Sequence, residues 1–133
     1  MSYHALNTDR DMNLAVIQEP GNNIQTAINI GHSLRAAIAD HSNGAMGYRE
    51  YQILESIMSE YLGQRQMVME QGMRLNHLGS RYTLHKSIKK LIALGFVAIE
   101  ESQDSRLRPL VPTEQALTLF TNISDRIRTL VNK

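Results

Sequence analysis

The sequence predicts a mainly helical fold that carries one small β-hairpin, and three observations support this. The length of 133 residues fits a single domain. Tryptophan is absent and only two phenylalanines occur, so the core must be built from aliphatic side chains and the seven methionines, which favours helices over a β-sandwich. Apolar residues also recur at three- and four-residue steps along several segments of the chain.

The composition also limits the class of protein and its compartment. Cysteine is absent, which excludes disulfides, thiol nucleophiles and cysteine–zinc sites. No apolar run approaches the ~20 residues that a membrane-spanning helix needs. The start of the chain lacks the basic and apolar regions of a secretory signal. We therefore expect a cytoplasmic protein without a membrane partner.

The N-terminal half is expected to contain an arm and two helices. Residues 1–22 form a polar arm, and its short apolar patch, Met12–Ile17, is expected to dock on another surface such as a partner subunit. Residues 23–133 are predicted to form a single domain. It begins with helices over 23–41 and 48–62, because apolar side chains recur there at helical spacing.

The middle of the chain contains the clearest helix signal. Residues 66–68 are predicted to be extended, and residues 69–76 to form a brief helix. Residues 81–94 combine an inward apolar stripe with a basic outer side, and Ser80 is a good N-cap. The pair Gly95–Phe96 is expected to end this helix in a Schellman motif.

A β-hairpin and a last helix are predicted to follow. A strand over residues 96–101 is joined through a polar turn to a returning strand over 107–111. Pro109 is expected to confine the returning strand to the edge of the sheet. Thr113 is the predicted cap of the last helix, along which apolar residues recur close to a heptad.

Charge is distributed unevenly along the chain. Residues 1–70 carry a net charge of −4, whereas residues 71–133 carry +5, and no Asp or Glu occurs between Gln71 and Ile99. Such a block of one sign suggests a contact face for an anion. A solvated basic helix face is the competing interpretation.

The order of short helix, tight turn, basic helix and hairpin is typical of a winged helix-turn-helix, which is the fold that we predict: mainly α with a small β-hairpin wing. An α-helix fits the ~12 Å major groove of B-DNA. The recognition helix would cover about residues 80–94, and a wing over about 96–111 would contact the backbone or the minor groove. The candidate DNA-binding residues are Ser80, Arg81, Tyr82, Thr83, His85, Lys86, Lys89, Lys90, Arg106 and Arg108.

These candidates are expected to divide between bases and phosphates. The side chains expected to contact base edges are Arg81, Tyr82 and His85, and those expected to contact phosphates are Lys86, Lys89, Lys90 and Arg108.

The two arginines of the wing are expected to project to the same side of a strand, because they are two residues apart. The competing interpretation is that Arg106 and Arg108 pair with acidic residues of the hairpin. An Asp104–Arg106 pair in particular would leave Arg108 freer to bind.

These residues resemble the MarR (multiple-antibiotic-resistance-regulator) type of winged-helix transcription factor, over roughly residues 24–132. The recognition helix of that family ends in a Leu-x-x-x-Gly pattern, here within Leu91–Val97, and an acidic residue and an arginine follow in the wing, here Asp104–Arg106. The next helix starts with a Leu-Thr-x-x-Gly pattern, here Pro112–Ala116, where proline and alanine replace the usual leucine and glycine.

The resemblance implies a homodimer whose interface is formed by the first and last helices of the domain. The apolar stripes of the two helices supply the candidate dimerisation residues, which are Ile24, Ile28, Leu34, Ile38, Phe120, Ile123, Ile127 and Leu130. Members of the family vary in ligand sensing, and a small-molecule effector that binds a methionine-lined pocket is left open.

The sequence contains no pattern that predicts an enzyme. No phosphate-binding glycine pattern and no Gly-x-Ser-x-Gly elbow occurs, and the five histidines lack the spacing of a metal site. We therefore expect no catalytic residues, no metal and no cofactor, with double-stranded DNA and a second copy of the chain as partners. The alternative is a protein-interaction module that docks its basic helix on an acidic partner; a small enzyme ranks last.

Overall fold

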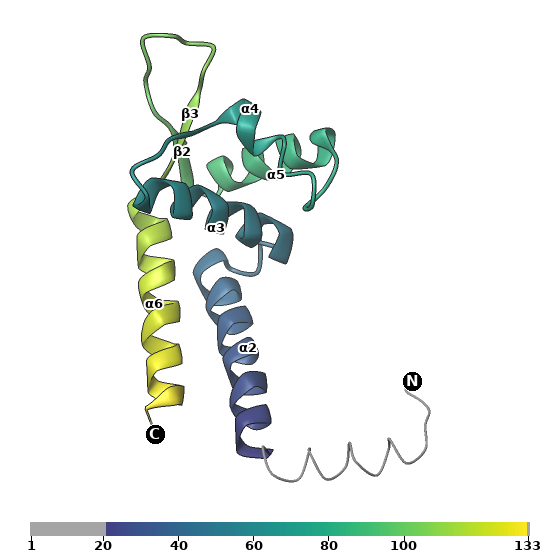
Figure 1. Cartoon of the computed structure of the whole chain (residues 1–133), viewed down its shortest axis with the longest axis vertical. Coiled ribbons are helices and arrows are strands. Elements are labelled where there is room, and N and C mark those ends of the chain that lie inside the picture. Colours follow the sequence, from purple (N-terminus) through teal and green to yellow (C-terminus); the bar gives the residue numbers. More distant parts are fainter. Residues whose placement is uncertain (1–20, 133) are drawn as a thin grey trace.

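The computed structural model describes residues 21–132, which form a mainly helical fold with a small three-stranded antiparallel sheet (Figure 1). The elements are α2 (Gly21–Ser42), α3 (Tyr48–Leu62), β1 (Met67–Val68), α4 (Met69–Gly72), α5 (Arg81–Ala93), β2 (Val97–Ile99), β3 (Pro109–Pro112) and α6 (Glu114–Val131). The predicted docking of Met12–Ile17 lies outside the described residues. Helix α2 begins at Gly21, two residues before the predicted start of the first helix at residue 23.

The molecule has two parts, which we call the stalk and the head. The stalk consists of α2 and α6, which lie side by side and extend away from the remaining elements (Figure 1). The head consists of α3, α4, α5 and the sheet, and the loop between β2 and β3 projects from it on the side opposite the stalk. Among the described residues, no helix is both long and apolar enough to cross a membrane.

One aliphatic core joins the elements of the head to the first turns of α6. Its largest fully buried side chains come from α3, α5, the turn after α5, the sheet and α6, and they include Ile53, Leu54, Ile57, Leu84, Ile88, Leu91, Phe96, Leu110 and Leu119. Because these residues recur at helical spacing on α3 and α5, each of the two helices has one anchored face and one outward face.

The predicted boundaries of α3 and the predicted end of α5 are confirmed. The Gly95 N–H donates to the Ile92 carbonyl (3.1 Å) and the Phe96 N–H donates to the Leu91 carbonyl (3.0 Å), which is the hydrogen-bond pattern of a Schellman motif. Gly95 has φ +89°, in the left-handed region, and Phe96 is fully buried. This motif turns the chain directly from α5 into β2.

The prediction that Pro109 confines its strand to an edge is wrong, because β3 is the central strand in the order β1-β3-β2. Pro109 and Pro112 are the first and last residues of β3, so neither removes a donor from the middle of the strand. The carbonyl of Pro109 still accepts a hydrogen bond from the Glu100 N–H (2.9 Å). On the other edge of β3, the strand β1 is only two residues long, so it pairs with only two residues of β3.

The two strands that were predicted to form a wing, β2 and β3, are shorter than predicted, and residues 100–108 between them form a loop, which we call the predicted wing. The Leu107 N–H donates to the Asp104 carbonyl (3.0 Å), and Arg108 has φ +49°. A left-handed residue interrupts extended backbone. The strand alternation that would send Arg106 and Arg108 to the same side is therefore absent.

The candidate dimerisation residues differ in how far the protomer itself already covers them. Ile38 and Ile123 are buried where α2 packs against α6, with 5% and 7% of their surfaces exposed, whereas Ile24 and Ile28 are 43% and 46% exposed. The remaining four are half-buried, namely Leu34, Phe120, Ile127 and Leu130. The surface left for a second copy is therefore centred on the N-terminal half of α2.

Gly95→Ala is expected to destabilise the protein, because an alanine in the left-handed region costs about 1–2 kcal/mol and its Cβ would lie 2.7 Å from Gln115 Oε1. Thermal unfolding should show a midpoint lowered by several degrees. Gly31→Ala is the matched control, because Gly31 is helical and its added Cβ would meet only the Arg35 side chain at 3.4 Å. The control should unfold at the same temperature or higher, and equal midpoints for Gly95→Ala and the wild type would contradict the prediction.

Candidate nucleic-acid interface

The outward face of α5 presents an aromatic ring and two lysines. Tyr82 is 76% exposed, and Lys86 and Lys89 follow it at helical spacing on the same exposed side. Within residues 21–132 neither lysine makes an ion pair. The opposite side of the helix is fixed by fully buried leucine and isoleucine side chains, so this face is held outward by the core.

An open groove of about 690 Å³ lies between the outward face of α5 and the first turn of α3. Its cations are Arg49 from α3 and Lys86, Lys89 and Lys90 from α5. The Arg49 Nε donates to the Leu78 carbonyl (2.8 Å), which ties α3 to the turn before α5. Arg49 was not among the predicted residues, because it belongs to the acidic half of the chain and joins the basic helix only through the packing of α3 on α5.

A buried carboxylate holds the two walls of this groove together. Glu50 is 8% exposed, and its oxygens accept hydrogen bonds from the Gly47 N–H (2.7 Å) and the Ser87 hydroxyl (3.1 Å). Lys90 Nζ lies 3.5 Å from Glu50 Oε1. Lys90 was predicted to contact phosphate, and its ammonium group already has an anionic partner at the edge of the groove.

Arg81 is engaged by a carboxylate that the sequence analysis did not single out. Its Nη1 and Nη2 donate to the two oxygens of Glu70 at 2.5 and 2.8 Å, which is a bidentate pair. Arg74 Nε lies 3.3 Å from the same carboxylate. The hydrogen bonds from Arg81 lower the pKa of Glu70 from 4.5 to about 2. Arg81 therefore lies on the flank of α5 that faces α4, and Tyr82 occupies the centre of the outward face.

The other predicted residues of α5 have distinct positions. The Ser80 hydroxyl accepts the Thr83 N–H (3.2 Å) and donates to the Thr83 hydroxyl (3.0 Å), so these two residues form the N-terminal cap of the helix. Thr83 also lines the groove. His85 is half-buried, one turn after Arg81 on the same flank. Nine of the ten predicted residues thus divide between the groove, the α4 flank and the loop between β2 and β3, and the tenth, Ser80, caps α5.

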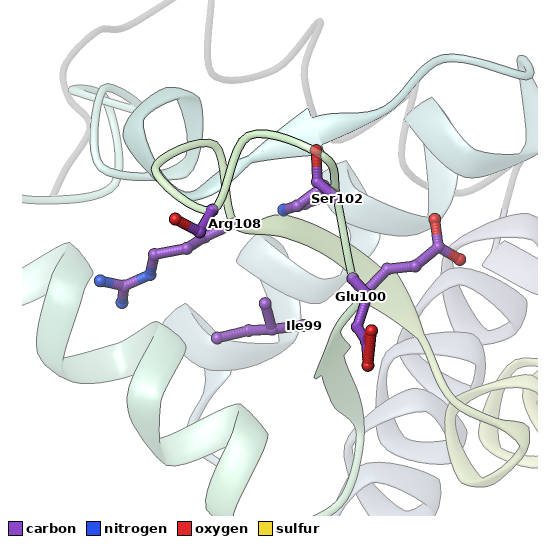
Figure 2. A pocket seen from close by; sticks show the side chains of 7 residues that line it. Ile99, Glu100, Ser102 and Arg108 are labelled. Atoms are coloured by element: carbon purple, nitrogen blue, oxygen red, sulfur yellow. The ribbon is translucent and has the colours of Figure 1, made fainter.

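The predicted wing, the loop of residues 100–108, contains one paired and one unpaired arginine. Arg106 Nε and Nη2 each lie 3.0 Å from an oxygen of Asp104, as predicted, and these hydrogen bonds lower the pKa of Asp104. Within residues 21–132 Arg108 makes no ion pair. Figure 2 shows its guanidinium extending to the side of the loop opposite the carboxylate of Glu100, which accepts a hydrogen bond from Gln66 Nε2 (3.1 Å). Arg108 is therefore the cation that the wing presents.

In the part of the chain that the structure describes, no cluster of three or more His, Asp or Glu side chains could hold a metal ion. Comparison with known proteins finds no matching family model, no matching curated protein and no matching solved structure. The resemblance to MarR-type regulators therefore stays a prediction from sequence motifs.

The Arg81–Glu70 pair is expected to survive acid conditions that protonate ordinary carboxylates. Because the pKa of Glu70 lies below its ordinary value of 4.5, the contribution of the pair to stability is fully present above about pH 4.5 and is lost as the pH falls through about 2. Carbonyl-carbon NMR titration of the Glu70 side chain measures this pKa directly. Arg81→Ala should return it close to 4.5, whereas Arg74→Ala should raise it less. A titration near 4.5 in the wild type would contradict the geometry.

Proposed function

We propose that this chain is a cytoplasmic transcriptional regulator that binds specific double-stranded DNA sequences as a homodimer, with a winged helix-turn-helix fold in which α5 is the recognition helix. The outward face of α5 is the observation that carries this proposal. Tyr82, Lys86 and Lys89 stand on a helix whose other face is buried, and no carboxylate occurs in that helix or in the turn before it. A helix of 13 residues is about 20 Å long and fits the major groove.

The groove beside α5 supports a phosphate contact next to the base contacts. In a duplex the phosphates flank the major groove, so cations on the rim of a recognition helix meet them while its centre meets base edges. Arg49, Lys86 and Lys89 line this groove, and none of the three makes an ion pair within residues 21–132. This arrangement favours DNA over an isolated acidic peptide, because unpaired cations lie on both walls of the groove, Arg49 on α3 and Lys86 and Lys89 along α5.

The wing supports a second, smaller contact. Its loop contains Glu100, Glu101 and Asp104 against Arg106 and Arg108, so the wing is acidic by one charge, and Asp104 engages Arg106. Because DNA is a polyanion, a loop with a net negative charge is not attracted to it overall. Arg108 alone is placed to enter a minor groove or to contact a phosphate, since narrow minor grooves attract arginine.

The stalk supports the homodimer. Ile24, Ile28 and Val131 are large apolar side chains that stay 43%, 46% and 52% exposed on α2 and α6. Pairing two stalks about a two-fold axis would cover them and would present two copies of α5 to one face of a duplex. Half-sites about one helical turn, ~34 Å, apart would then form an imperfect palindrome.

Lys89→Ala is expected to weaken binding to duplexes of any sequence and to lower the slope of log K against log salt by about one unit, as the loss of one phosphate contact does. Fluorescence anisotropy with a random duplex at several salt concentrations measures that slope. Arg65→Ala is the matched control, because it removes one exposed positive charge at the opposite end of α3. Equal slopes for Lys89→Ala and the control would contradict the phosphate role, and a wild type without salt-dependent binding to duplex DNA would contradict the proposed function.

Ile28→Glu is expected to dissociate the homodimer, because it places a charge in the apolar surface that a second stalk would cover. Analytical ultracentrifugation should show the dimer constant weakened by at least tenfold. Leu107→Glu is the control, since Leu107 is 45% exposed, close to the value for Ile28, but lies in the wing loop. A wild-type chain that sediments as a monomer at micromolar concentration would refute the dimer.

A further inference from the structure

The Arg81–Glu70 pair uses one edge of the guanidinium and leaves another available. An arginine side chain has five N–H donors, and Glu70 accepts one from each terminal nitrogen. Within residues 21–132 no acceptor takes the Nε–H of Arg81. That N–H and the remaining N–H on the adjacent terminal nitrogen form a second fork. The Arg81 side chain as a whole is 59% exposed.

The free fork has the chemistry that recognises guanine. Guanine presents O6 and N7 as adjacent acceptors in the major groove, and a bidentate arginine is the commonest specific contact to them. Arg81 is also the first residue of α5. The N-terminal end of a recognition helix is the part that usually contacts base edges.

Glu70 fixes this fork before any DNA is bound. A long side chain loses rotamer freedom when it forms a contact, and that loss weakens binding unless the side chain is already ordered. Glu70 is positioned by α4, whose first residue, Met69, is buried and donates its N–H to the Arg108 carbonyl (3.0 Å). The guanidinium is thus attached through α4 to the base of the wing.

We propose that Glu70 is a positioning residue that aims Arg81 at one guanine in each half-site, so that the pair sets sequence preference and contributes little to general attraction for DNA. This inference rests on the proposed function. The pair has no net charge, whereas Lys86 and Lys89 carry unpaired charges and supply the general attraction. Base preference and salt dependence therefore belong to different residues of the same helix.

A masking role for Glu70 makes the opposite prediction. If the carboxylate only neutralised Arg81, its removal would add one free cation and would strengthen binding to every sequence by the same factor. If it positions Arg81, its removal strengthens binding to random DNA and weakens the preference for one base. The comparison of specific with random DNA therefore separates the two roles.

The experiment selects binding sites from a random-sequence duplex library with the full chain, in the wild type, Glu70→Gln, Arg81→Ala and Glu60→Gln. Glu60→Gln is the matched control, since it removes one carboxylate that pairs with an exposed arginine, Arg65, away from α5. We expect a two-fold symmetric wild-type motif. Glu70→Gln and Arg81→Ala should lose the guanine at the same pair of symmetric positions, and the control should keep it.

Affinities then give the size of the effect. On the selected site, changing that guanine should weaken wild-type binding by about 5- to 150-fold, the range of one good bidentate base contact. The same base change should cost Glu70→Gln at most a third of the wild-type factor. Arg81→Lys keeps the charge but has no fork, so it should lose the guanine while the salt slope stays unchanged. If Glu70→Gln fails to fold, this variant still tests whether the Arg81 fork reads the guanine.

The outcomes separate this inference from the proposed function. A wild-type motif that either Glu70→Gln or Arg81→Lys leaves intact would overturn the inference alone. The inference would also be overturned if Glu70→Gln strengthened binding to the selected and the random duplexes by the same factor, and if Glu60→Gln did the same. A wild type that enriches no sequence, or binds no duplex at all, would overturn the proposed function and this inference together.

Discussion

The buried carboxylate of Glu50 is the constraint on which the geometry of the head depends. It is the only charged side chain that is buried among residues 21–132, and a buried charge is stable only when donors surround it. Its donors come from the start of α3 and from the middle of α5. Any rotation of α5 about its axis would remove Ser87 from this carboxylate. The polar contact thus selects one orientation from those that aliphatic packing alone would allow, and in that orientation Lys86 and Lys89 face outward.

Carboxylates of the same chain also neutralise cations on the surface, so a count of basic residues overstates the positive charge that α5 and the predicted wing present. Three cations in these elements face carboxylates of the same chain: Arg81 faces Glu70, Lys90 faces Glu50 and Arg106 faces Asp104. Exposed ion pairs add little to stability, but they do lower the charge available to an anion. Lys86, Lys89 and Arg108 have no such partner within the described residues. A partner that is a polyanion would therefore be attracted mainly by these three and oriented by the paired groups.

The periodic parts of the fold could be predicted from the sequence, because they depend on neighbours within one or two helical turns. The boundaries of α3, the cap at Ser80 and the end of α5 at Gly95 all follow from local hydrogen bonds. The partners of Arg81 and Glu50 could not be predicted in this way. Ser87 lies 37 residues from Glu50, and Glu70 lies 11 residues from Arg81 across a turn. Only the packing of α3 and α4 on α5 brings these groups together.

The sheet and the stalk show a second limit of sequence patterns. A pattern indicates that a residue is apolar, or that its backbone is restricted as in proline, but it does not indicate which part of the protein packs against that residue. Pro109 tolerates a central position because β1 is too short to demand more donors. Ile38 and Ile123 belong to the same stripes as the exposed Ile24 and Ile28, yet α2 and α6 cover them within one protomer.

The contacts between α2 and α6 include Asp40 with Arg126 (2.9 Å) and His41 with Asn122 (3.1 Å), all at the end of α2 that adjoins the head. Ala37 of α2 and Ala116 and Leu119 of α6 are also fully buried in the core that α3 and α5 form, so the angle between stalk and head is fixed within the protomer. In the proposed homodimer this angle would determine how far apart two recognition helices stand, so the spacing of half-sites would depend on the stalk, while the bases recognised would depend on the head.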